Sequence, residues 1–264
     1  MIRHGYRITL YWQHDDRPVD LFANRLAMFL SALRGVSPSL ADWMVATTAG
    51  ARPISGPQAC AAALDAGRDA LGEGAHARAF YEVDLWAVAP EPPRTDEPEF
   101  LGVPGARWTA PPAKGTRAGE LSLIWGMAPV AQLPVWMPNR LELRLHRGIA
   151  GQGIATTVSS ILKLAVTSFG PEWAVVGTEG RPTPPSLGSN GVPRVGWMTY
   201  LCSRFPPLPA IEPPGAVQPI GGGHLITAFD GRYQPPNDAQ DAAIEKVRVT
   251  LDRAGVLVSG TSLR

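Results

Sequence analysis

The sequence predicts an α+β protein with a mixed, largely antiparallel sheet, or two such sheets, and about four helices. Residues 7–12 and 139–146 alternate apolar and polar side chains, which is typical of half-buried strands. Residues 18–35 and 153–169 instead carry apolar side chains every three or four positions, which is typical of amphipathic helices. Strands and helices do not alternate strictly along the chain, and this favours α+β over a doubly wound parallel sheet.

The amino-terminal part predicts one strand followed by two helices. After the strand at residues 7–12, Pro18 suits the first turn of a helix, and Gly35 is expected to end it. A second helix is predicted from 57 to 71, with Gly72 as its stop. The first helix has the clearer apolar stripe, formed by Val19, Phe22, Leu26, Phe29, Leu30 and Leu33.

The middle of the chain contains two predicted strands, at 80–89 and 120–126, separated by a long segment rich in proline, glycine and charge. This segment, residues 90–118, is longer than most loops of compact domains, and such loops are often functional. The strand at 139–146 follows, and a helix is predicted from 153 to 169, stopped by Gly170-Pro171.

The last third predicts short strands at 173–176, 195–201 and 224–229, and then a final helix. Asn237 is suited to cap that helix, and Gly255 is expected to end it. Four tryptophans lie in or beside predicted strands and are expected in the core, namely Trp12, Trp125, Trp173 and Trp197.

The length of 264 residues is compatible with a single domain at 1–264. Strand, helix, proline and tryptophan follow one another at 6–43 and again at 140–173, so two related halves, 1–135 and 136–264, are an alternative organisation.

Composition and charge indicate a folded protein without a general affinity for polyanions. The net charge is +1, which does not suit a nucleic-acid binder held by many phosphate contacts. No apolar run approaches the length of a membrane span, and the amino terminus lacks a signal-like apolar region, so we expect a cytoplasmic protein. Cys60 and Cys202 show no metal or redox spacing and are expected to be small buried apolar residues.

The strongest enzyme-like pattern is the glycine turn at Gly148, Gly151 and Gly153, between a strand and a helix. Such glycines could let backbone amides hold a phosphate, and the pattern resembles the Arg-x-x-Gly-x-Gly loop of acetyl-CoA-dependent N-acetyltransferases. Arg147 lies one residue too far from Gly151 for that loop, and a tight turn is the alternative. No catalytic residue, cofactor or metal site is predicted from the remaining sequence.

Several further segments, taken in order, carry a resemblance to a known family. They are Tyr11-Trp12, Arg25, Phe29-Leu30, Pro38, Trp43, Leu123-Ile124-Trp125-Gly126, Asn139, Pro171-x-Trp173, Gly196-Trp197-Met198-Thr199-Tyr200-Leu201 and Leu208-Pro209, followed by a glycine-rich hairpin and a final helix. In this order they resemble the immunity protein 52 family, found beside polymorphic toxins of bacterial contact and type VI secretion systems.

The resemblance implies a non-enzymatic, cytoplasmic antitoxin that binds and occludes a restriction-endonuclease-like nuclease toxin, without direct contact to nucleic acid or membrane. It implies no catalytic residue and no cofactor, and it leaves the oligomeric state open. A nuclease presents a basic surface to DNA, so an acidic patch on the inhibitor would speed association. The densest such patch contains Asp96, Glu97 and Glu99 beside Phe100 and Trp108, and we expect toxin contacts there. A solvated, proline-rich loop without a binding role is the alternative.

Overall fold

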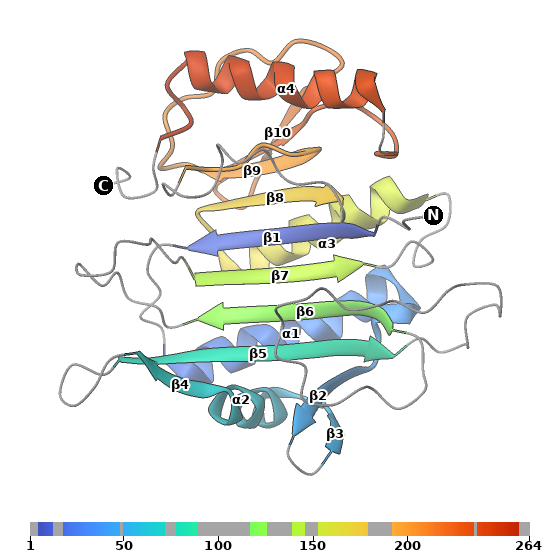
Figure 1. Cartoon of the computed structure of the whole chain (residues 1–264), viewed down its shortest axis with the longest axis vertical. Helices are drawn as coiled ribbons and strands as arrows, with labels where there is room; N and C mark the ends of the chain where they lie inside the picture. The colour runs from blue at the N-terminus through green and yellow to red at the C-terminus, as the bar shows by residue number, and fades with distance from the viewer. Residues whose placement is uncertain are drawn as a thin grey trace.

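The computed structural model of the chain is an α+β fold, as predicted (Figure 1). It describes residues 5–12, 18–47, 50–71, 78–88, 117–125, 139–145, 153–178, 192–234 and 237–258. In these residues, four α-helices accompany an 11-stranded sheet, and every strand pairing is antiparallel.

The strands are joined in the order β10-β11-β9-β8-β1-β7-β6-β5-β2-β3, with β4 paired to β5. Strand β1 occupies the centre, where it pairs with β7 on one side and β8 on the other. The strands are β1 Tyr6–Trp12, β2 Trp43–Thr47, β3 Gly50–Pro53, β4 Arg68–Leu71, β5 Arg78–Val88, β6 Arg117–Trp125, β7 Asn139–Leu145, β8 Trp173–Thr178, β9 Met198–Cys202, β10 Ala216–Ile220 and β11 Gly223–Thr227. Both of the predicted halves contribute strands to this sheet, and a single domain at 1–264 stays a proposal.

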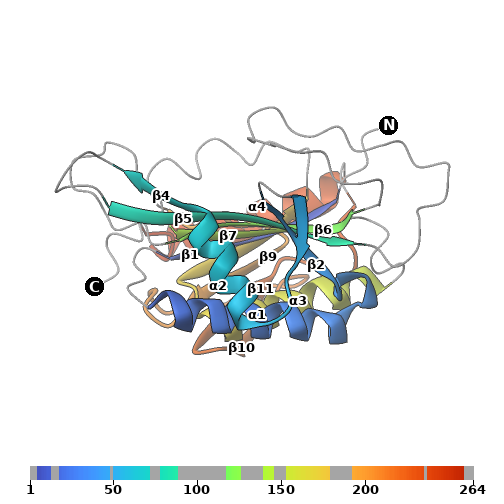
Figure 2. The same ribbon diagram turned by 90° about the horizontal axis from the view of Figure 1, so that it is seen from below.

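Three helices, α1 (Val19–Val36), α2 (Pro57–Ala66) and α3 (Ile154–Phe169), form a layer on one face of the sheet (Figure 2). The fourth helix, α4 (Asp238–Arg253), lies at the end of the sheet that carries β9 and β10 (Figure 1). None of these four helices has the length and apolar character that crossing a lipid bilayer requires.

The core lies between the helix layer and the sheet. Along β1, Ile8, Leu10 and Trp12 point to one face and are buried, as their alternation predicts. Phe169, at the end of α3, contacts Trp12 and also joins α3 to α1 through Phe22 and Phe29. The buried tryptophans include Trp12, Trp43, Trp173 and Trp197, whereas the side chain of Trp125 lies outside the described part of the structure.

Two helices end where the sequence predicts, each beside a glycine in the left-handed backbone conformation. Gly170 has φ 60° and follows α3, and Gly255 has φ 67° beyond α4. The predicted end at Gly35 is wrong, because α1 continues to Val36 and the amide of Ser37 closes the last turn on the carbonyl of Leu33. The second helix is shorter than predicted, because residues 68–71 pair with β5 as strand β4.

The turn between β10 and β11 is a two-residue hairpin, as its glycines predict. Gly221 and Gly222 have φ values of 53° and 76°, which side chains rarely tolerate. At Gly223, an added Cβ would lie 2.3 Å from the carbonyl oxygen of Leu201, so β9 and β11 approach too closely there for any side chain.

Asn237 caps α4, and its replacement with alanine is expected to lower the free energy of unfolding by about 1 kcal/mol. Its side-chain oxygen accepts a hydrogen bond of 3.1 Å from the amide of Gln240, which otherwise lacks a helical partner. Urea unfolding measures the loss. The Asn237→Ser variant should retain most of the stability, and equal losses for serine and alanine would contradict a capping role.

Candidate functional site

The face of the central strands that lies away from α1 and α3 carries several charged side chains. We call it the charged sheet face, and it consists of Arg7 and Tyr11 on β1, Glu120 on β6, and Arg140, Glu142 and Arg144 on β7. The strand register brings these residues together, because Arg144 lies opposite both Arg7 and Glu120, and Arg140 lies opposite Tyr11. Strand alternation alone therefore gathers six polar side chains on one surface.

The two carboxylates of this face are buried and paired. Glu120 is 7% exposed and Glu142 is 8% exposed. The guanidinium of Arg144 lies 2.8 Å from Glu142 and 4.0 Å from Glu120. Burying an unpaired carboxylate is costly, so Arg144 compensates both charges locally.

Tyr11 stands at the edge of the charged sheet face and stacks on Trp173. The ring centroids are 5.0 Å apart and the ring planes differ by 19°. Burial raises the pKa of Tyr11, the positive charges of Arg194, Arg140 and Arg7 oppose that rise, and the negative charge of Glu142 adds to it. The Nε atom of Arg140 is buried without a hydrogen-bond partner in the described structure.

A second charged group lies at the start of β8. The Glu172 carboxylate is 5% exposed and accepts a hydrogen bond of 2.8 Å from Arg204, whose side chain is 51% exposed. Burial disfavours the charged form of Arg204, but the neighbouring Glu172 carboxylate raises its pKa overall. The pair ties the loop after β9 to the start of β8.

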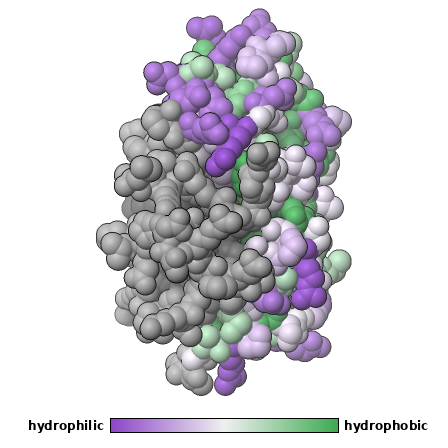
Figure 3. All heavy atoms as spheres, turned by 90° about the vertical axis from the view of Figure 1, so that its right-hand side faces the viewer, coloured by the Kyte–Doolittle hydropathy of each residue, from purple (hydrophilic) through white to green (hydrophobic). Residues whose placement is uncertain are grey.

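The charges on and beside α4 have a different character, because several of them form ion pairs at the protein surface. Figure 3 shows hydrophilic residues gathered at the end of the molecule where α4 lies. Lys246 and Glu212 form an exposed ion pair of 2.7 Å, and Arg248 pairs with Glu245 at 2.6 Å. The hydrogen bond from Lys246 holds the pKa of Glu212 below its usual range, but exposed pairs of this kind contribute little to stability.

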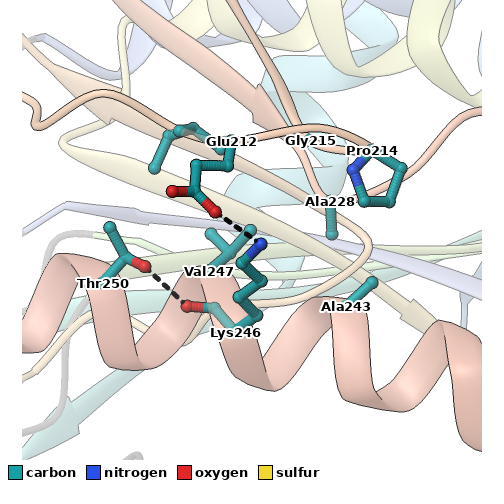
Figure 4. A pocket seen from close by; sticks show the side chains of 9 residues that line it. Glu212, Pro214, Gly215, Ala228, Ala243, Lys246, Val247 and Thr250 are labelled. Carbon is teal, nitrogen blue, oxygen red and sulfur yellow. Dashed lines mark hydrogen bonds and ion pairs between the residues drawn. The ribbon is translucent and has the colours of Figure 1, made fainter.

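Two cavities of the described structure are, respectively, very small and shallow. One lies between α4 and residues 211–215, with a volume of about 10 Å³, which is room for a single water molecule (Figure 4). Another, of about 520 Å³, is a shallow depression around the β10–β11 turn, lined by Ser203, His224 and the turn glycines. No group of three metal-ligating His, Cys, Asp or Glu side chains occurs among the residues that the structure describes.

The predicted toxin contacts Asp96, Glu97, Glu99, Phe100 and Trp108 lie outside the described residues. So do Gly148 and Gly151 of the glycine turn. Gly153 is described, and it lies directly before α3 with φ −86°, an ordinary backbone conformation. Cys60 is buried, as expected, whereas Cys202 is only half-buried, and both are free thiols.

Sequence reasoning assigned Arg140, Glu142 and Arg144 to one side of a strand but did not identify them as a site. The signal was present, since three charged residues alternate on a strand whose other face is entirely leucine. The Glu172–Arg204 pair had no comparable signal, because the pairing of β8 with β9 brings the two residues together.

Comparison with known proteins identifies a family whose sequence model matches part of the chain, and a solved structure with a similar fold. Residues 146–259 match the sequence model of the family described as Immunity protein 52. The solved structure of "Pseudomonas aeruginosa T6SS protein PA0821" is similar with a TM-score of 0.51 and 11% identity, covering 92% of this chain and 76% of that chain. At this identity the likeness shows a shared fold. No protein with a curated description matches the chain. The segment at residues 146–259 therefore matches the Immunity protein 52 family, as the resemblance described in the sequence analysis implies.

Proposed function

We propose that the protein is a cytoplasmic immunity protein that binds a restriction-endonuclease-like nuclease toxin, a type VI secretion effector, and blocks it. The match of residues 146–259 to Immunity protein 52 carries this proposal. The fold shared with a T6SS protein of Pseudomonas aeruginosa supports it. The surface chemistry is also compatible, because half-buried arginine and aromatic side chains lie together on the charged sheet face.

The proposed mechanism is stoichiometric occlusion without turnover. A tightly bound partner covers the nuclease surface that DNA must reach, so inhibition needs no chemistry on the inhibitor. The acidic residues Asp96, Glu97 and Glu99, with Phe100 and Trp108, remain proposed contacts for the basic DNA-binding surface of the toxin.

The purified protein is expected to abolish plasmid cleavage by the nuclease encoded beside its gene when the two proteins are mixed in equimolar amounts. The measurement is a plasmid degradation assay titrated with the protein, together with a binding isotherm for a catalytically inactive toxin. A nuclease from an unrelated toxin system serves as the control and should remain active. Full cleavage by the neighbouring nuclease at a large excess of the protein would refute the proposal.

The acetyltransferase alternative makes a different prediction about ligands. A ligand that binds only the folded state raises the melting temperature by mass action. Acetyl-CoA should leave the melting temperature unchanged if the protein is an immunity protein, whereas the inactive toxin should raise it. A shift with acetyl-CoA alone would favour the enzyme and a phosphate-binding role for Gly148–Gly153.

A further inference from the structure

The solvent-facing side of α1 carries no charge along most of its length. This helix packs against both α2 and α3 and turns one side away from the sheet (Figure 2). Between residues 21 and 32 its exposed residues, which we call the α1 outer stripe, are Leu21, Asn24, Met28, Ser31 and Ala32. The two large apolar members, Leu21 and Met28, are 42% and 71% exposed. Since the outer side of a surface helix normally carries charged and polar residues, the α1 outer stripe suits a covered surface better than a solvated one.

Helix α4 shows, by contrast, the pattern expected of a helix that faces water. Its charged residues are Asp238, Asp241, Glu245, Lys246, Arg248, Asp252 and Arg253. Although α1 is longer, its charged residues are only Asp20, Arg25 and Arg34. Arg25 donates a hydrogen bond of 3.5 Å to the carbonyl oxygen of Ser168 and therefore turns toward α3. Loss of charge around an exposed methionine is typical of the centre of a protein interface.

The two remaining charges of α1 lie at its opposite ends. Asp20 is in the first turn and Arg34 in the last turn, with Met28 close to the midpoint between them. At 3.6 residues per turn, the directions of Asp20 and Arg34 differ by only about 40° around the helix, so both lie along the same edge of the α1 outer stripe. Arg34 forms an exposed ion pair of 3.5 Å with Asp42, and Asp20 forms none within the described part of the chain.

We propose that the α1 outer stripe binds a second copy of this chain, with the two α1 helices antiparallel about a two-fold axis near Met28. A two-fold axis repeats every contact, so Asp20 of each copy meets Arg34 of the other. The uncharged stripes then cover each other, and the dipoles of the two helices are opposed. A parallel arrangement would instead place like charges at the same level.

Charge complementarity is the reason for choosing a second copy as the occupant. The α1 outer stripe has an acid at one end and a base at the other, so its own antiparallel copy offers a base to the acid and an acid to the base. The pairing involves the helix layer only, and the opposite face of the sheet points away from the partner copy. This inference goes beyond the proposed function, because it needs no toxin.

The oligomeric state of the purified chain is the first test. Sedimentation velocity is measured from about 1 to about 100 µM, because an interface built on one pair of helices is small, with an expected dissociation constant on the order of 10 µM. The mass should rise across this range from 28.2 kDa toward twice that value. The copies are separate at the lowest concentration, so unfolding measured there reports the single chain.

The Met28→Asp variant tests the position of the axis. It places two like charges close together at the centre of the interface, and it should weaken pairing about 10-fold or more. The matched control is Val217→Asp, since Val217 is also an exposed apolar residue, 40% exposed, but lies on the edge strand β10. The control should pair like the parent. Thermal melting of each variant at the lowest concentration establishes that its fold is intact.

Charge reversal tests the antiparallel arrangement. Asp20→Arg and Arg34→Asp each place like charges together in a pair of identical copies, so each should weaken pairing a few-fold. An equimolar mixture of these two variants restores opposite charges at both ends of the interface. The mixture should therefore pair like the parent, although neither variant does so alone.

Each contrary result overturns a stated part of the proposal. A parent that remains a monomer up to the highest concentration overturns the pairing itself, and the immunity function still stands if that monomer inhibits the toxin. Equal pairing of Met28→Asp and the parent overturns the α1 interface, and loss of pairing in Val217→Asp alone moves it to the edge of the sheet. Single charge variants that pair like the parent overturn the antiparallel arrangement.

Discussion

Replacing Trp197 with alanine is expected to lower the free energy of unfolding by about 3–5 kcal/mol, because a fully buried indole leaves a cavity. Trp197 has no exposed surface, and its ring lies 5.7 Å from that of Tyr6 and 6.2 Å from that of Phe229. Its Nε1 donates a hydrogen bond of 3.4 Å to the carbonyl oxygen of Phe229. Trp197, which lies directly before β9, therefore packs against Tyr6 of β1 and against Phe229 in the segment that leads to α4. Chemical denaturation gives the loss directly.

The Trp197→Phe variant separates lost volume from lost aromatic contact, and it should cost less than alanine because much of the ring packing remains. Binding of the toxin should persist at temperatures where the alanine variant is still folded. If Trp197→Ala unfolds like the parent but no longer binds the toxin, Trp197 belongs to the interface and its assignment to the core is wrong.

Phe169→Ala is expected to produce a loss of similar size, about 3–5 kcal/mol. Its ring lies 6.1 Å from Trp12, 5.7 Å from Phe22 and 5.2 Å from Phe29, so one side chain joins β1, α1 and α3. Its carbonyl also accepts a hydrogen bond from the indole of Trp12, and the substitution keeps this backbone contact. The loss would therefore report side-chain packing alone, measured by the same denaturation curve.

Met28 offers the control for Phe169. It lies on α1 but is 71% exposed, so Met28→Ala should change the unfolding free energy by no more than about 0.5 kcal/mol. Similar losses for Met28→Ala and Phe169→Ala would contradict the packing of α1 and α3 through the aromatic cluster.

The sequence predicts those helices and strands whose apolar residues recur with a regular period within one segment. Helices α1, α3 and α4 and strands β1 and β7 have long periodic patterns, and the structure contains each of them within a few residues of its prediction. Strands β2, β3, β4 and β10 were not predicted. Strands β9 and β11 are as short but were predicted, because most of their residues are buried and apolar, whereas β3 is exposed along its whole length. Strand β10 is exposed along most of its length, so it shows no apolar alternation at all.

In the candidate site too, the features that one segment determines could be predicted, whereas the features that depend on strand pairing could not. Alternation along β7 placed Arg140, Glu142 and Arg144 on one face, which the structure confirms. Their relation to Tyr11 and Glu120 depends on which strands pair and in which register, and a single sequence does not encode that in any short segment. The stack of Tyr11 on Trp173 likewise arises from the pairing of β1 with β8.

The central position of β1 affects how quickly a newly made chain can fold. Tyr6 pairs with Leu145 on one side and with Thr178 on the other, so β1 waits for both neighbours to be synthesised. At translation rates on the order of ten residues per second, this wait lasts on the order of ten seconds. Pairings so distant in sequence also fold slowly once they can form. Under the proposed immunity function, a cell would therefore depend on molecules folded before the toxin arrives, because a chain whose synthesis begins afterwards would fold too late.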